Sequence, residues 1–208
     1  MKTKTLIIVF LALCLVYAGV CLAGVPEPAR LVFKVLPIAL LLVNTLYLAV
    51  KTGDRGRYLM AAALLFSAIG DISGPLMTMG IFFALSHCFY ITAYSRRFCL
   101  KTAKQWVCIA ILLLIVGFVT AISLPGLLKT SGPAMIAVGL TYLAVLTAMS
   151  FMAISQSRPY WILFAVGSLL FVISDCSIIV STYAFAIPAR HLTVMSTYYA
   201  AQLLMNLK

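Results

Sequence analysis

The chain has 208 residues, of which 64% are hydrophobic and only 9% are charged, and its formal net charge is +11. Soluble domains contain about 45–50% apolar and about 25% charged residues, so this chain has too few polar side chains to cover a core in water. The composition therefore excludes soluble enzymes, disordered chains and disulfide-stapled scaffolds. The repeated long apolar runs indicate a multi-pass helical membrane protein.

We predict an all-α fold in which the whole chain, 1–208, forms a single integral membrane domain with eight membrane-spanning helices. The predicted spans are 5–23, 31–50, 58–73, 80–95, 105–123, 133–154, 160–181 and 190–207. Proline and glycine are concentrated at or near the junctions between the apolar runs, and Pro125-Gly126 is expected to mark the end of the fifth span.

The fifteen Lys and Arg residues lie almost wholly between the apolar runs, as expected of orientation signals and of contacts with anionic headgroups. We therefore expect membrane lipids, and no nucleic acid, as partners. Assigned to alternate sides of the membrane, these residues divide into eleven and four, so both termini are predicted to be cytoplasmic. The short loops and small size favour a bacterial inner membrane.

The chain contains a weak internal similarity. A shift of 104 residues superposes the following pairs: Asp71 on Asp175, Ser73 on Ser177, His87 on His191 and Tyr94 on Tyr198. With four spans in each half, this similarity predicts two parallel repeats, 1–104 and 105–208.

Two of the four acidic residues, Asp71 and Asp175, lie inside predicted spans. A carboxylate at mid-membrane costs about 2.5–3.5 kcal/mol on insertion scales, so each is a candidate functional residue. The alternative interpretation is structural: each aspartate neutralises a cation such as Lys34 or hydrogen-bonds to a neighbouring helix. The matching settings L-L-F-S-A-I-G-D and L-L-F-V-I-S-D favour a functional site.

Depth in the membrane supports the same interpretation. At a rise of 1.5 Å per residue, Asp71, Asp175, Lys34 and His87 are all expected about 3–10 Å below the non-cytoplasmic boundary. We therefore predict a polar layer at that level, although His87 is equally consistent with a hydrogen bond between helices, and Lys34 with a side chain that extends to the surface.

Polar residues also follow helical faces, which are expected to point inward because lipid cannot satisfy them. The first face carries His87, Tyr90 and Tyr94, and the second carries His191, Met195, Tyr198 and Gln202. Ser67 lies one turn before Asp71. No lipase-type serine elbow, zinc-protease helix or nucleotide-binding loop is present. We expect no cofactor and no metal, the alternative being a zinc site built from Asp71, His87, Asp175 and His191 without signature spacing.

Five segments carry a resemblance to a known family. They are F-K-V-L-P (33–37), L-L-F-S-A-I-G-D (64–71), H-C-F-Y (87–90), G-S-L-L-F-V-I-S-D (167–175) and T-Y-Y-A-A-Q-L-L (197–204). In this order they resemble the YhhN-like family of integral membrane proteins, which includes the lysoplasmalogenases. The first, fifth and sixth predicted spans carry no matching motif.

The resemblance implies hydrolysis of the vinyl ether bond of a lysoplasmalogen, which gives a fatty aldehyde and a glycerophospho-alcohol. This reaction needs an acid that protonates the β-carbon and an anion or base that stabilises the cation and activates water. Two carboxylates in different surroundings can supply these roles, as in glycosidases. We therefore expect Asp71 and Asp175 to be catalytic, with the assignment of acid and base left open.

A lysophospholipid substrate requires further contacts. Lys34 is expected to hold the phosphate, with Arg30 and Arg190 as alternatives, and the other candidate substrate-binding residues are Ser67, His87, Tyr90, Tyr198 and Gln202. Competing functions are a lipid or small-molecule transporter or flippase, a non-catalytic lipid sensor or assembly factor, and a hydrolase of another ether, epoxide or ester lipid.

Overall fold

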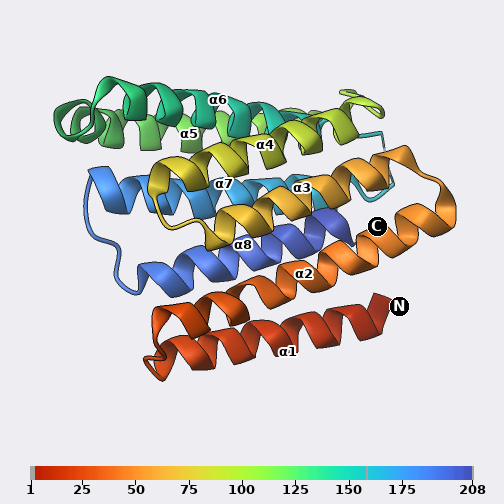
Figure 1. Ribbon diagram of the computed structural model, residues 1–208. Coiled ribbons are helices and arrows are strands. Elements are labelled where there is room, and N and C mark those ends of the chain that lie inside the picture. The colour runs from red at the N-terminus through yellow and green to blue at the C-terminus, as the bar shows by residue number, and fades with distance from the viewer. Residues whose placement is uncertain (1–2, 158, 208) are drawn as a thin grey trace. The chain divides into compact units, whose positions relative to one another are not determined.

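The computed structural model describes residues 3–157 and 159–207 and is all-α over that part of the chain, with eight helices (Figure 1). The prediction of eight helices is therefore confirmed. The chain divides into two compact units, the first ending at Ala93 and the second running from Tyr94 to Asn206. Each unit is described by itself below. The predicted repeat and the predicted cytoplasmic termini stay predictions.

The first unit contains α1 (Thr3–Leu22), α2 (Glu27–Thr52), α3 (Arg55–Ile72) and most of α4 (Leu76–Ser95). Helix α2 packs against both α1 and α3. The turn between α2 and α3 is short because Gly53 adopts a left-handed conformation (φ 66°) and donates its amide to Ala49 O. Asp54 then caps α3 by accepting a hydrogen bond from the Gly56 amide at 2.8 Å.

Small and polar residues bring α3 and α4 together in the first unit. The Ser86 hydroxyl donates to Ala63 O at 2.8 Å and lies 2.8 Å from the Ser67 hydroxyl. A Cβ at Gly70 would lie 2.9 Å from the Phe83 ring, so only glycine allows this approach. Such small-residue and hydroxyl contacts are typical of helix packing in membranes, where apolar burial does not drive association.

The second unit contains α5 (Ala103–Thr130), α6 (Pro133–Ile154), α7 (Trp161–Tyr183) and α8 (Arg190–Asn206). Helix α7 is its centre and packs against the other three helices (Figure 1). A Cβ at Gly167 would lie 2.9 Å from Met205 Cγ, and the Ser174 hydroxyl donates to Val194 O at 3.0 Å. The polar face of α7 is thereby held against α8.

One predicted junction is wrong. Pro125-Gly126 does not end the fifth helix, because α5 continues through both residues to Thr130. The reason is helix packing: at Gly126 a Cβ would overlap the carbonyl oxygen of Tyr183 on α7. The absence of a side chain at Gly126 lets the two backbones approach, so the glycine serves close packing and does not form a turn.

Six of the eight described helices are long and apolar enough to cross a membrane. The exceptions are α3 and α8. Helix α3 has 18 residues and includes Arg55, Arg57 and Asp71, and α8 has only 17 residues. The protein is therefore an integral membrane protein, and membrane crossing by α3 and α8 stays a prediction.

Candidate active site

Asp71 lies at the end of α3 and is 4% exposed. Lys34, from α2, places its Nζ 3.0 Å from Asp71 Oδ1 and also donates to the Asp71 backbone carbonyl at 3.0 Å. The last carbonyls of a helix have no partner within the helix, and the helix dipole favours a cation there. The lysine therefore satisfies both the carboxylate and the end of α3, instead of extending to the surface.

Two further residues of the first unit lie close to this ion pair. Tyr17, on α1, is 1% exposed and is near enough to both Arg30 and Asp71 to interact with their charges. Arg30 precedes Lys34 by one helical turn on α2. Glu27 lies in the first turn of α2, three residues before Arg30, so the two cations at this end of the first unit are accompanied by two carboxylates, those of Glu27 and Asp71.

Asp175 lies on α7 and is 6% exposed. The hydroxyl of Tyr142, on α6, donates a short hydrogen bond to Asp175 Oδ2. The structural interpretation weighed from the sequence describes both aspartates accurately: Asp71 pairs with a cation, and Asp175 is hydrogen-bonded to a neighbouring helix. The same contacts also give the two carboxylates different electrostatic surroundings, since an ammonium carries a charge and a phenol does not.

The other candidate residues of the first unit are buried. Ser67, His87 and Tyr90 each have no exposed surface. Ser67 is engaged with Ser86 between α3 and α4. Its hydroxyl therefore contributes to helix packing, whatever further role it has.

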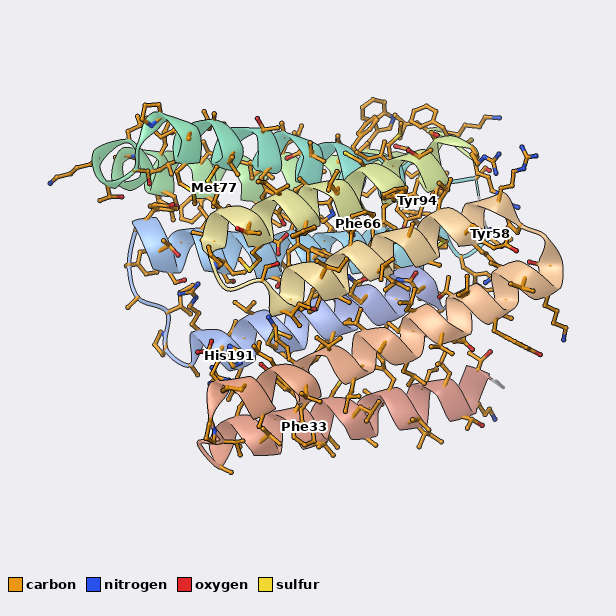
Figure 2. The ribbon with its side chains drawn as sticks, in the orientation of Figure 1. Phe33, Tyr58, Phe66, Met77, Tyr94 and His191 are labelled. Carbon is orange, nitrogen blue, oxygen red and sulfur yellow. The ribbon has the colours of Figure 1, made fainter. Side chains whose placement is uncertain are left out.

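In the second unit, Tyr198 and Gln202 are buried on α8, and the Tyr198 ring meets Phe171 edge-on at 5.4 Å between centroids. His191 is different. It is exposed in the first turn of α8 (Figure 2), so it does not share the burial of its predicted counterpart His87. Within each unit, the described residues hold no group of three or more His, Cys, Asp or Glu side chains suited to a metal.

Sequence reasoning missed Tyr17 and Tyr142. Both lie in spans without a family motif, and a tyrosine in a membrane helix is common enough at interfaces to carry little information by itself. The ion pair of Lys34 and Asp71, by contrast, is the structural alternative that the sequence offered for Asp71, and it is present. The prediction that Asp71 and Asp175 act on one substrate stays a prediction.

Comparison with known proteins gives consistent results. Lysoplasmalogenase TMEM86A from Bos taurus and from Homo sapiens are each 32% identical to this chain over 158 residues, which is 69% of this chain and 62% of the relative. Lysoplasmalogenase TMEM86B from Homo sapiens is 32% identical over 179 residues, 84% of this chain and 72% of that protein. No solved structure matches the chain. Residues 29–208, which include Asp71 and Asp175, match the YhhN family, and the chain therefore belongs to that family.

Proposed function

We propose that this protein is a membrane hydrolase that cleaves the vinyl ether bond of lysoplasmalogens. Its relatives at 32% identity are named lysoplasmalogenases, which supports this substrate class. The observation that carries the proposal is the presence of two buried carboxylates on α3 and α7, one paired with an ammonium and the other with a phenol. Acid-catalysed hydrolysis of a vinyl ether needs such a pair of unlike groups.

The reaction proceeds in three steps. The acid transfers its proton to the β-carbon of the vinyl ether, and the double bond becomes an oxocarbenium ion centred on the α-carbon. Water adds to that carbon as its proton passes to a carboxylate, giving a hemiacetal. The hemiacetal then breaks its bond to the glycerol oxygen, releasing the fatty aldehyde and the glycerophospho-alcohol. One water is consumed, and no oxidant or cofactor is needed.

The partners of the two aspartates support an assignment of roles. Burying an uncompensated carboxylate costs several kcal/mol, a cost that the Lys34 ammonium offsets for Asp71. The ammonium favours the anionic role for Asp71, which leaves the role of proton donor to Asp175, hydrogen-bonded to the neutral hydroxyl of Tyr142. We assign Asp175 as the proton donor and Asp71 as the anion that stabilises the oxocarbenium ion. Tyr142 is a positioning residue that orients the Asp175 carboxyl group.

Substrate binding completes the proposal. Lys34 already donates twice to Asp71, so Arg30, one turn earlier on α2, is the cation of the first unit best able to hold the substrate phosphate with it. His87 and Tyr90 in the first unit, and Tyr198 and Gln202 in the second, remain our candidates for positioning water and the glycerol hydroxyl. Ser67 acts through its contact with Ser86.

The test is to incubate the purified protein in nanodiscs with a lysoplasmalogen in D₂O and to analyse the products by mass spectrometry. We expect a fatty aldehyde with one deuterium at the carbon next to the aldehyde, because that carbon receives the catalytic proton. An alkyl ether lysolipid of equal length, which lacks the double bond, serves as the control and should remain intact. Recovery of unchanged lysoplasmalogen, with or without movement across vesicles, would overturn the hydrolase proposal.

A further inference from the structure

A dense group of cations occupies the connection between α4 and α5 and the first turn of α5, in the second unit. Arg96, Arg97, Lys101 and Lys104 are all exposed and fall within nine consecutive residues that contain no acid. We call these four residues the basic loop. A basic excess on a membrane loop normally acts as an orientation signal, which needs no defined conformation.

The basic loop, however, is folded, and a buried glutamine organises it. Gln105, 3% exposed, lies in the first turn of α5. Its Oε1 accepts from the backbone amides of Lys101 and Thr102, each at 3.0 Å. Its Nε2 donates to Cys99 O at 2.9 Å and to Ile154 O, at the end of α6, at 3.1 Å.

A second buried glutamine ties the loop to the end of α6. Gln156, 2% exposed, donates from Nε2 to Tyr94 O at 2.9 Å and to Met152 O at 2.7 Å. The backbone adds two bonds across the same junction, Cys99 N to Ser155 O at 2.9 Å and Ser157 N to Arg97 O at 3.0 Å. The backbone that carries the four cations is therefore held in one conformation.

Among the described residues of the second unit, no side-chain carboxylate is available to neutralise the basic loop. Asp175 is the only acidic residue between Tyr94 and Asn206 in the sequence, and it accepts a hydrogen bond from Tyr142. It also lies well along α7, about 21 Å from the beginning of that helix at 1.5 Å per residue. Within the second unit, the described side chains therefore provide no acidic partner close to the start of α7 for the charge of the loop.

Exposed aromatic rings accompany the basic loop. Phe98 is 50% exposed and Trp106 is 58% exposed. Aromatic side chains beside Lys and Arg are typical of the level at which lipid headgroups meet the acyl chains. The combination of cations and aromatic rings fits an anionic phospholipid better than a soluble phosphate, because a soluble phosphate has no apolar part that could contact the rings.

We propose that the basic loop, which shares no residue with the proposed hydrolytic site, is a binding site for anionic phospholipid headgroups. The guanidinium and ammonium groups bind the phosphate diester, and Phe98 and Trp106 contact the glycerol and upper acyl region of the same lipid. Ligand binding here does not depend on the lysoplasmalogenase proposal, so the two can fail independently.

The chain offers a matched control on the turn between α2 and α3. Lys51, Arg55 and Arg57 form a second basic group, but Asp54 lies among them and the turn has no buried glutamine. We compare the variant R96Q/R97Q/K101Q/K104Q with the variant K51Q/R55Q/R57Q. A third variant, Q105L, keeps all four cations but releases the loop backbone.

The experiment measures, by native mass spectrometry, the phosphatidylglycerol and phosphatidylcholine retained by the full chain after extraction from vesicles containing both. We expect the wild-type protein and the Lys51 group variant to retain phosphatidylglycerol preferentially. The basic-loop variant should lose this preference, with binding weakened roughly fivefold for each cation removed. Q105L should lose part of the preference for phosphatidylglycerol. Added inorganic phosphate should not compete with the lipid for the site.

The single substitutions R97Q and K101Q keep the test decisive if the fourfold variant does not fold. Each should reduce phosphatidylglycerol retention while leaving the thermal midpoint unchanged, because both side chains are exposed. Equal losses in the two multiple variants, or no preference in the wild-type protein, would overturn the proposal. Displacement of the lipid by inorganic phosphate would show that the site takes a soluble phosphate instead.

Discussion

Asp71 and Asp175 are the same residue type in matching sequence settings, yet they have unlike neighbours. Lys34 holds Asp71 with an ion pair and a second bond to its carbonyl, whereas Tyr142 holds Asp175 with a neutral hydroxyl. The local sequence around both aspartates is apolar and alike, so it predicted their burial; Lys34 was a candidate partner of Asp71, but Tyr142 was not predicted as the partner of Asp175. Those partners come from other helices, and only packing of α2 on α3 and of α6 on α7 selects them.

The Lys34–Asp71 pair makes a prediction about stability. Lys34→Met removes the ammonium that pairs with the buried Asp71 carboxylate, which should lower the free energy of unfolding by about 3 kcal/mol. Asp71→Asn should cost less, because Lys34 is 16% exposed and can redirect its charge to headgroups. Thermal unfolding in detergent measures both, and the double variant should be more stable than Lys34→Met alone. A double variant less stable than Lys34→Met would contradict the pairing.

The Tyr142–Asp175 hydrogen bond makes a prediction about catalysis. Tyr142→Phe should lower kcat roughly 10–100-fold with little change in KM, because the phenol orients Asp175 and does not bind substrate. In a protein that already carries Asp175→Asn, the Tyr142→Phe substitution should cause no further loss of kcat. Steady-state kinetics of aldehyde release measure this, with Tyr47→Phe, an exposed tyrosine on α2, as the control. A loss confined to KM, or an equal loss in the control, would contradict the positioning role.

At the scale of single elements, apolar runs and breaker residues predicted eight helices, and α5 contains the principal error. Pro125-Gly126 has the composition of a turn, but α5 runs on to Thr130. Whether a Pro-Gly pair ends a helix depends on the helix that packs against it. Here the carbonyl oxygen of Tyr183, on α7, occupies the position that a side chain at residue 126 would fill. The basic loop is a second example of a feature that depends on packing. Its charges can be read from the sequence, but its hydrogen bonds to the end of α6 through Gln105 and Gln156 cannot.

Two glycines of α5 allow a matched test of this packing. Gly126→Ala places a methyl group against the backbone of α7 and should destabilise the protein by about 1–3 kcal/mol. Gly117→Ala meets nothing within 4 Å, so it should be neutral or stabilise the helix by up to about 1 kcal/mol. Denaturation midpoints in the same detergent compare them. Equal effects of the two substitutions would show that α5 and α7 are not in close contact at Gly126.

At the scale of the whole molecule, each unit contributes one carboxylate to the proposed reaction. The family match from residue 29 onward includes both aspartates, and it leaves out all of α1, which supplies Tyr17. The sequence therefore predicted the membrane class, the helices and the two acids, because these depend on composition and local pattern. It could not predict that Tyr17 and Tyr142 lie near the two aspartates, because a contact between two helices produces no pattern in the sequence of either helix alone.

Aldehyde release from lysoplasmalogen by the wild-type protein and by Asp71→Asn, Asp175→Asn and the double variant, at equal protein levels, tests the central claim most directly. If the two carboxylates serve one reaction, Asp175→Asn should reduce turnover about 10²–10⁴-fold, Asp71→Asn should also reduce it, and the double variant should be no slower than the slower single variant. Full turnover in either single variant would remove that aspartate from catalysis. Losses that multiply in the double variant would contradict their joint action.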